Sequence, residues 1–213
     1  RRGKKREENK LDWKVINADF RKIQQELNDY FPYKVVRADY AEGDDVIAAL
    51  AMRAGVYLGD GEEPILIVSN DKDFGQLQMF SNVRQWSSSV GFIEHSDPET
   101  FLRDLILPGD SGDDVPNVLS EDNCFVVGKR QTVLSPKRKK TLIEAMETGN
   151  YPKDEIFASV QRRIIRNTIL IDFRKIPKHI KNRIYEEHDR EKDPPKGKLF
   201  DYFFKTGLRN QIE

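Results

Sequence analysis

ILIVSNDKD, residues 65–73, sets two aspartates directly after an unbroken run of apolar residues. Apolar residues that do not alternate with polar ones are typical of a strand buried on both faces, as in a parallel sheet. We therefore predict a buried strand over Ile65–Ser69. Ligands of such sheets collect outside the carboxyl ends of the strands, and Asp71 and Asp73 fall at that position.

Two further groups of carboxylates lie near predicted chain turns. Carboxylates that gather repel one another unless divalent cations neutralise them, and hard oxygen ligands suit Mg²⁺ or Mn²⁺, with a phosphate as a further ligand. The pattern therefore predicts one divalent-metal site, although helix capping or a polar turn remains the alternative for each group alone. The members are Glu42, Asp44 and Asp45 in one group, and Asp110, Asp113 and Asp114 in the other.

Composition and charge narrow the class of protein. No apolar run among the 213 residues approaches the length that spans a membrane, so no membrane partner is expected. The single cysteine, Cys124, excludes an internal disulfide framework and fits the cytoplasm, or the host-cell cytoplasm if the chain is phage-encoded. Residues 1–115 carry 15 basic and 22 acidic side chains, and residues 116–213 carry 21 and 14. An acidic half for cations beside a basic half for phosphates favours phosphodiester cleavage; an uneven solvated surface is the alternative.

The predicted elements run from mixed α/β to purely helical. Apolar residues at helical spacing from Trp13 to Leu27, and the helix-opening pair Ser135-Pro136, are the clearest helix signals. Strand, helix and strand in succession imply a parallel sheet with right-handed crossovers. The fold class is thus an α/β core followed by an α-helical region. Helices are predicted over 11–30, 44–54, 73–79, 97–107, 135–148, 154–170, 177–189 and 198–206, and extended segments over 33–38, 65–69 and 83–93.

Three motifs together carry a family resemblance. They are YAEGDD at 40–45, SNDKDFGQL at 69–77 and GDSGDDVPNV at 109–118. In this order they resemble the 5′-nuclease (flap endonuclease) superfamily, most closely its branch of T-even-like bacteriophage ribonucleases H, over nearly the whole chain. The resemblance implies a parallel-sheet, PIN-like nuclease core lacking its first strands, followed by an α-helical DNA-binding region. It also implies a metal-dependent 5′ to 3′ exonuclease and flap endonuclease that removes RNA primers during DNA replication.

The same resemblance assigns roles to the carboxylates. Two Mg²⁺ (or Mn²⁺) ions would be the cofactors. The implied partners are replication proteins and DNA or RNA–DNA duplexes with 5′ ends or flaps. Asp45 would belong to the helix start. The first ion would be bound or oriented by Glu42 and Asp44, with Asp71 nearby. The second ion would be held by Asp73 and Asp113, largely through water, and Asp110 would assist there. The catalytic residues would thus be Glu42, Asp44, Asp71, Asp73 and Asp113.

The sequence departs from the family pattern at its start. Family members begin with two Asp-bearing strands before a basic arch, whereas this sequence begins within the arch. We expect two metal-site carboxylates to lie on a separate chain, as in a split gene, or the sequence to be a fragment, so that the chain alone cleaves DNA poorly. The expected division is a basic arm (1–10), an α/β metal-binding nuclease core (11–115) and a helical DNA-binding domain (116–213).

Basic residues in two regions are candidates for nucleic-acid binding. The family's Gly-Ile-Gly-x-Lys hairpin is absent from 118–134, although a helix-hairpin-helix role remains plausible there. Four consecutive basic residues at a helix start oppose the helix dipole, which favours phosphate contact over a merely solvated helix start. For the arm, a disordered tail is the alternative. The candidates are Arg2, Lys4, Lys5 and Arg6 in the arm, and Lys129, Arg130, Lys137, Arg138, Lys139 and Lys140.

Two other classes of protein stay open at this point. Asp71-x-Asp73 after an apolar strand, with Gly109-Asp110 later, also resembles a haloacid-dehalogenase-type phosphatase, in which Asp71 would be a covalent nucleophile. Its Gly-Asp motif should follow a strand, but here it follows a predicted helix. The other alternative is a non-catalytic half-nuclease kept for DNA binding, against which the presence of all these acidic residues argues.

Overall fold

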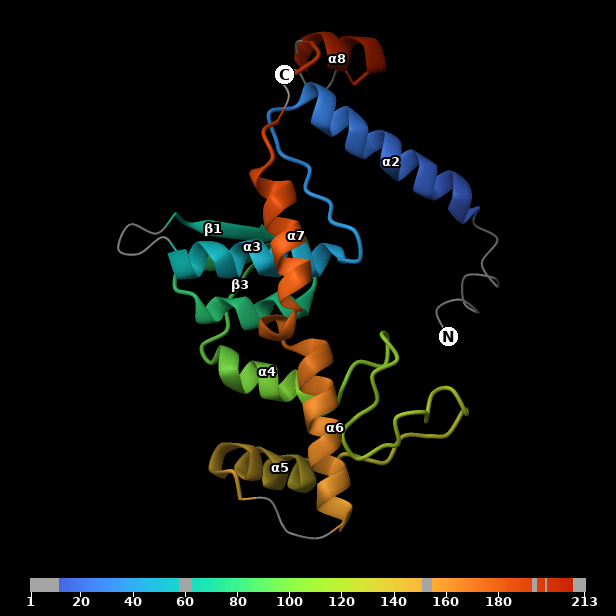
Figure 1. The fold of residues 1–213 in the computed structure, drawn as a ribbon, viewed down its shortest axis with the longest axis vertical. Helices are drawn as coiled ribbons and strands as arrows, with labels where there is room; N and C mark the ends of the chain where they lie inside the picture. Colours follow the sequence, from blue (N-terminus) through green and yellow to red (C-terminus); the bar gives the residue numbers. More distant parts are fainter. Residues whose placement is uncertain (1–11, 58–62, 151–154, 193–194, 198, 209–213) are drawn as a thin grey trace.

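The computed structural model describes residues 12–57, 63–150, 155–192, 195–197 and 199–208. A small sheet lies at its centre, with helices stacked around and below it (Figure 1). Within these residues no helix is both long and apolar enough to cross a membrane. The arm at 1–10 lies outside the described residues.

The sheet has three strands in the order β1 (Ile65–Val68), β2 (Val83–Ser87) and β3 (Gly91–Ile93). Strands β1 and β2 run parallel, with Ile65 opposite Val83, and β2 and β3 form an antiparallel hairpin. The connection from β1 to β2 is the 3-10 helix η2 (Lys72–Met79). The predicted extended pair over 83–93 is thus confirmed. A parallel pair is present, but it joins β1 to β2 and not to residues 33–38.

Helix α3 (Gly43–Tyr57) and helix α7 (Lys178–Asp189) build the main core with β1 and η2. Small residues let α3 approach closely: Ala48 and Ala49 are fully buried. Ile180 and Ile184 of α7 belong to the same core, so this late helix packs with the sheet region. This packing fixes the start of α3 and the end of β1 relative to each other.

Strand β1 is less buried than its sequence predicts. Only Ile67 is buried, while Leu66 and Val68 on the other face are 53% and 65% exposed. Within the described residues β1 pairs with β2 alone, so its other edge carries no strand. The prediction of a strand buried on both faces is therefore wrong for this structure, because nothing among the described residues covers that face.

The strand predicted over 33–38 is also absent. These residues form irregular backbone, and lysine side chains rather than a strand ladder bind this part of the chain. Lys192 Nζ donates to the carbonyl oxygens of Phe31 and Tyr33, and Lys34 Nζ donates to that of His188 at 2.6 Å. The segment is nevertheless held against α7, and it delivers the chain to the start of α3.

A second core lies below the sheet. It is formed by α4 (Pro98–Ile106), α5 (Pro136–Thr148) and α6 (Glu155–Ile171), with Leu107 and Val118 from the intervening loop. Asp97 and Ser135 cap α4 and α5, each followed by proline in the first turn, as the sequence predicts. The short helix η3 (Phe173–Lys175) connects α6 to α7.

Residues 107–134 contain turns and loops but no helix. A helix-hairpin-helix would need a helix before the turn at Gly128, and the structure has none there. Instead the segment is folded on itself: Asn117 donates to the carbonyl oxygen of Thr132, and the backbone N–H of Thr132 donates to Ser120 Oγ. These residues therefore do not form a helix-hairpin-helix, and phosphate binding by the basic residues stays a prediction.

Helix α2 (Trp13–Tyr30) stands away from the sheet, and α8 (Leu199–Thr206) packs near its carboxyl end (Figure 1). No residue of α2 is buried. The contacts between the two helices are aromatic and polar. Tyr202 stacks on Tyr30 at 4.8 Å and donates a 2.8 Å hydrogen bond to Glu26, and Lys196 binds Asp29 through both its backbone and its side chain.

Candidate metal centre

One cavity of about 510 Å³ gathers the carboxylates from all three motifs. It lies between the start of α3, the start of η2 and the loop after α4. Residues that are far apart in sequence are brought together because the main core fixes α3 and η2 and the second core fixes the loop. Six acidic residues line the cavity: Glu42, Asp44, Asp71, Asp73, Asp110 and Asp113.

The first group sits at the start of α3, where its members also serve the helix. The backbone N–H of Glu42 donates to Asp45 Oδ2 at 3.0 Å, and that of Asp45 donates to Asp44 Oδ1 at 3.0 Å. Carboxylates at this position satisfy free amides and favour the helix dipole. Asp45 thus has the helix-start role expected for it and does not line the cavity. Glu42 is exposed, and its side chain has no such capping bond in the described structure.

The second group begins η2. Asp71 caps this helix: its Oδ1 accepts a hydrogen bond from the backbone N–H of Asp73 at 3.0 Å. The turn that carries it is held by Gln85 of β2, whose buried amide donates to the carbonyl oxygens of Ser69 and Asp71 at 3.0 and 2.7 Å. Asp71 is therefore fixed from two sides, while Asp73 points into a half-buried position.

The third group lies in the loop after α4, and Gly109 shapes this loop. Its φ of +67° is in the left-handed region, and a Cβ there would lie 2.5 Å from the carbonyl oxygen of Val115. Asp110 Oδ1 accepts from the backbone N–H groups of Gly112 and Asp113 at 2.6 and 3.3 Å. Asp113 is exposed and also lines the cavity.

Asp73 is the residue most affected by this arrangement. Burial, followed by the negative charges of Asp71, Asp110 and Asp44, raises the pKa of Asp73 to about 6, although Lys72 opposes the shift. Its Oδ1 is buried without a hydrogen-bond partner among the described residues. A buried carboxylate oxygen without a donor is costly, so it is the atom in the cavity that a cation would stabilise most.

The donor set also limits how a cation could be held. Within the described residues, no three Asp, Glu, His or Cys side chains are close enough together to grip one ion directly. Mg²⁺ requires no such cage, because it keeps several waters and commonly uses one or two carboxylates with substrate phosphates. The acidic side chains of the cavity offer only oxygen donors, and Asp73 Oδ1 has no hydrogen-bond partner among the described residues. Such a donor set fits Mg²⁺ or Mn²⁺ bound largely through water.

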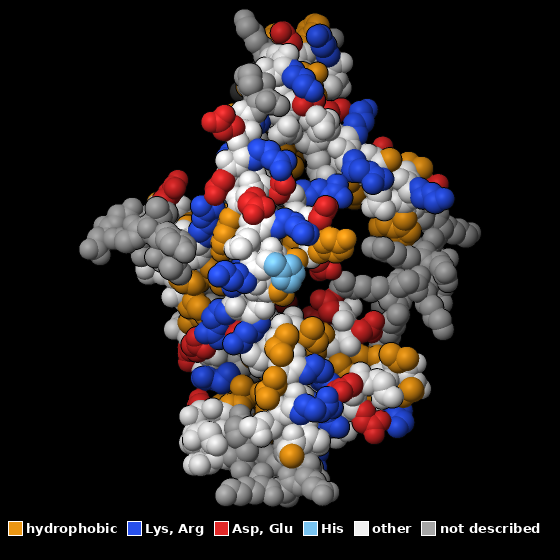
Figure 2. Space-filling model, in the orientation of Figure 1, with side chains coloured by type: hydrophobic (Ala, Val, Ile, Leu, Met, Phe, Trp, Pro, Cys, Tyr) orange, Lys and Arg blue, Asp and Glu red, His pale blue; other side chains and the backbone are white. Residues whose placement is uncertain are grey.

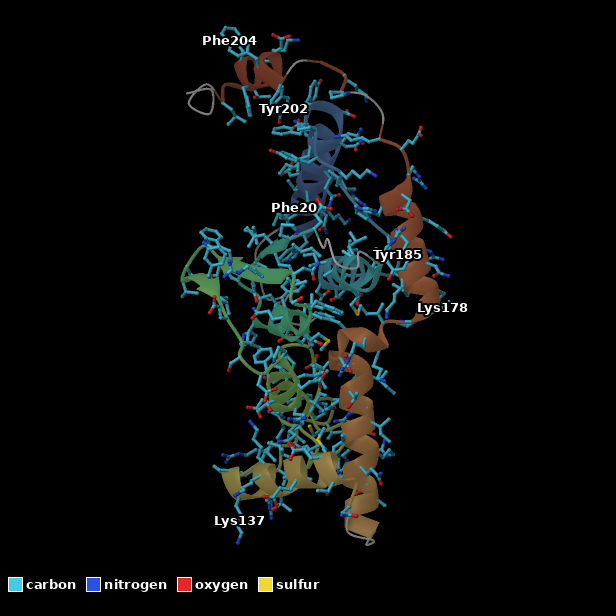
Figure 3. All side chains as sticks on the ribbon, turned by 90° about the vertical axis from the view of Figure 1, so that its left-hand side faces the viewer. Phe20, Lys137, Lys178, Tyr185, Tyr202 and Phe204 are labelled. Carbon is cyan, nitrogen blue, oxygen red and sulfur yellow. The ribbon has the colours of Figure 1, made fainter. Side chains whose placement is uncertain are left out.

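The predicted nucleic-acid-binding residues are spread more widely than the carboxylates. Lys129 pairs with Glu121 at 2.9 Å and Arg130 is exposed, both in the loop region after α4. In α5, Lys139 pairs with Asp104 at 2.9 Å and Lys140 with Glu144 at 4.0 Å. Lys137 points outward from the end of the molecule opposite α8 (Figure 3). Arg138 is also exposed there, and Arg2, Lys4, Lys5 and Arg6 lie outside the described residues.

Lysine and arginine side chains also cover the face formed by α6 and α7 (Figure 2). Sequence analysis did not single out this face, because its basic residues are interspersed with apolar ones along the helices. It also missed Lys72 in the cavity lining, Gln85 and the buried Asn167 of α6, which binds the acidic loop. Buried amides leave no periodic signal that separates them from surface residues.

The structure argues against the phosphatase alternative. The element directly before Gly109-Asp110 is the helix α4, not a strand.

Comparison with known proteins gives a consistent result. A family model described as the C-terminal part of T4 RNase H matches residues 97–213. The chain is 36% identical over 214 residues to ribonuclease H of Enterobacteria phage T4. The match covers 97% of this chain and 68% of that protein. It is 36% identical over 90 residues to flap endonuclease Xni of Shewanella sp. (strain ANA-3), covering 37% of this chain and 32% of that protein.

The fold has a counterpart among solved structures. A T5 protein co-crystallized with metal ions matches with a TM-score of 0.56 and 16% identity, over 87% of this chain and 74% of that one. At this identity the match supports the arrangement of sheet and helices rather than any residue's role.

Proposed function

The chain belongs to the T4 ribonuclease H family of 5′ nucleases, and on that basis we propose that it hydrolyses phosphodiester bonds at 5′ ends and flaps with divalent cations bound in the acidic cavity. The substrates would be DNA and RNA–DNA duplexes, and the biological role would be primer and flap removal during replication. The observation that carries the proposal is the convergence of six carboxylates in one cavity, among them the half-buried Asp73, whose Oδ1 has no hydrogen-bond partner among the described residues.

The roles of the side chains follow from their positions. Asp73 and Asp71 are offered as the inner ligands, because η2 and Gln85 hold them firmly and burial leaves Asp73 without a donor. Glu42, Asp44, Asp110 and Asp113 would orient the water molecules around the ions. Bound Mg²⁺ or Mn²⁺ would supply an activated water and offset the negative charge of the phosphate.

Among the described residues that line the cavity, Lys72 is the basic one. It is exposed, so its ammonium group can reach a phosphate that enters from solvent. The basic residues of α5 and the following loops would hold the duplex by its backbone without reading its sequence. In this scheme the acidic cavity binds cations and the basic surfaces bind phosphates.

Metal binding and cleavage should be measured separately. Isothermal titration of the metal-free chain with Mg²⁺ or Mn²⁺ should show binding that Asp73→Asn weakens at least tenfold. A 5′-labelled flap duplex, a nicked duplex and an RNA–DNA hybrid test cleavage, with EDTA as the metal-free control. Asp19→Asn on α2 is the matched control, because Asp19 is exposed and outside the cavity. Unchanged metal affinity in Asp73→Asn would refute the assignment of the site.

We further propose that a β-strand from a partner polypeptide covers β1. A groove of about 970 Å³ follows β1 and is bordered by α3 and α7. Its apolar lining includes Ile47, Leu50 and Leu66. Among the described residues no strand pairs with the adjacent edge of β1, so this edge can accept another strand. About a third of phage T4 ribonuclease H lies outside the matched region. The corresponding segment is the occupant that we propose.

Co-purification tests this second proposal. The part of phage T4 ribonuclease H outside the matched region would be expressed as a tagged polypeptide together with this chain. It should retain the wild-type chain and lose the variant Val68→Glu, which places a charge on the exposed face of β1. Val126→Glu is the control, since Val126 is exposed in a loop away from the groove. Equal retention of both variants would contradict the proposed position.

A further inference from the structure

Tyr40 has an unusual backbone conformation for a bulky residue. It is at the third position of a turn closed by the hydrogen bond from the Ala41 N–H to the Ala38 carbonyl oxygen at 3.3 Å, and its φ is +65°. This position favours glycine or asparagine, because a Cβ is strained there. The tyrosine ring recovers no burial in return, since the residue is 90% exposed. Folding alone therefore gives no reason for tyrosine here.

Arg183 of α7 accompanies this ring. Its guanidinium carbon lies 5.5 Å from the centre of the Tyr40 ring, and its Nη1 donates to the carbonyl oxygen of Asp39 at 3.2 Å. In the described part of the chain, no carboxylate lies within ion-pair distance of Arg183. The pair thus presents an aromatic face and an uncompensated positive charge side by side.

The pair also lies next to the acidic cavity. Tyr40 precedes the cavity residue Glu42 by two positions, which places their Cα atoms within about 7 Å of each other. A nucleic-acid chain whose phosphate enters the cavity therefore has its neighbouring nucleotides within reach of the ring. Aromatic side chains bind bases of any sequence by stacking, and arginine adds a phosphate contact.

We propose that Tyr40 and Arg183 form a nucleotide-binding platform beside the cavity, in which the tyrosine ring stacks on an unpaired base and the guanidinium contacts the adjacent phosphate. This inference rests on the proposed function for the identity of the ligand as nucleic acid. It adds two residues to the substrate-binding surface. Both would act in positioning, since neither lines the metal cavity.

Binding without metal tests the platform independently of cleavage. Fluorescence anisotropy in EDTA would use a labelled duplex with a 5′ single-stranded flap. Tyr40→Gly should raise the Kd about fivefold or more, the effect of losing one base-stacking contact, while Tyr40→Trp should preserve it. The thermal midpoint of Tyr40→Gly should be equal to or above that of the wild type, because glycine relieves the strain at this φ. Tyr33→Gly removes another exposed tyrosine of the same segment and should leave the Kd unchanged.

An abasic scan locates the contact. Replacing single nucleotides around the flap junction by abasic residues should weaken wild-type binding at one position, and this loss should disappear in Tyr40→Gly. Arg183→Gln should lower the slope of log K against log salt by about one. Equal affinities of wild type and Tyr40→Gly, or no wild-type binding, would overturn the platform. If Tyr40→Gly loses binding while the wild type never cleaves with Mg²⁺, the platform stands and the nuclease proposal fails.

Discussion

The side-chain amide of Asn167, in the carboxyl-terminal half of α6, donates a 3.0 Å hydrogen bond to the carbonyl oxygen of Pro116, at the end of the loop that follows α4 and carries Asp110 and Asp113. The same amide donates to the carbonyl oxygen of Ile106 at 2.8 Å, where the loop begins. One fully buried side chain thus holds both ends of the segment that carries Asp110 and Asp113. The helical half of the chain therefore takes part in building the acidic site.

Replacing Asn167 by alanine should loosen this loop. Two buried carbonyl oxygens lose a donor, so we expect a loss of about 1–3 kcal/mol in the free energy of unfolding, measured by chemical denaturation. Hydrogen exchange of residues 107–118 should accelerate more than that of β2. The control is Asn182→Ala, an exposed helical position whose change should stay within about 0.5 kcal/mol. Equal effects of the two variants would contradict the anchoring role.

The two glycines at 109 and 128 offer a matched test of loop geometry. Both have a left-handed φ, of +67° and +71°, but a Cβ at Gly109 would overlap the carbonyl oxygens of Val115 and Pro116, whereas Gly128 has open space. Gly128→Ala should cost about 1–2 kcal/mol, the strain of the conformation alone. Gly109→Ala should cost about 3 kcal/mol or more, because the overlap adds to the strain. Denaturation of both variants measures the difference, and a Gly109→Ala variant as stable as Gly128→Ala would refute it.

Asp73 should make the metal-free chain less stable as the pH rises. Its pKa is about 6 in the folded chain and 3.8 ordinarily, so the folded state binds the proton more tightly than the unfolded chain does. The free energy of unfolding should therefore fall between about pH 4 and pH 6 and stay low above that range. Asp73→Asn should be about 1–2 kcal/mol more stable than the wild type near neutral pH, after allowance for solvent screening, and equal to it near pH 4.

Thermal unfolding in EDTA across this pH range checks the prediction. Adding Mg²⁺ near neutral pH should stabilise the wild type more than the variant, because a ligand stabilises the state that binds it. The Asp19→Asn control should follow the wild-type curve. A wild-type stability that rises from pH 4 to pH 6 relative to Asp73→Asn would reverse the predicted sign.

The basic residues at the start of α5 should differ in their contribution to DNA binding. Lys137 is exposed and points outward, whereas Lys139 pairs with Asp104 at 2.9 Å and is less exposed. Lys137→Gln should therefore reduce the salt slope of DNA binding by about one without changing stability. Lys139→Gln should reduce it less. Anisotropy titrations at several salt concentrations measure both slopes, and an unchanged slope for Lys137→Gln would exclude this end of α5 from the interface.

Local chemistry explains which parts of this structure the sequence predicts. Helices with a capping residue and a proline start, such as α4 and α5, begin where Asp97 and Ser135 predict them. The six cavity carboxylates could be grouped because their motifs lie beside predicted strand and helix ends, where α/β folds gather their ligands, although the strand predicted before Glu42 does not form. The metal roles of these residues and the domain boundary after residue 115 stay predictions.

Features set by distant partners were not predictable. Residues 33–38 have strand-like composition, yet no neighbouring strand pairs with them. Lys192 binds the carbonyl oxygens just before and at the start of the segment, and Lys34 of the segment binds the carbonyl oxygen of His188. The apolar run of β1 indicates burial, but burial depends on what lies beside the strand. Asn167 and Gln85 are ordinary amides in the sequence, and only the folded chain shows that they hold the acidic segments.

The contacts of Tyr202 and Lys196 with α2 couple the folding of the two ends of the described chain. Helix α2 buries none of its residues, so its order depends on what α8 and its approach segment contribute. Removing α8 should therefore unfold α2, although the two helices are far apart in the sequence. A tag or truncation that disturbs α8 would therefore also reduce the helical structure of α2, near the amino-terminal side of the chain.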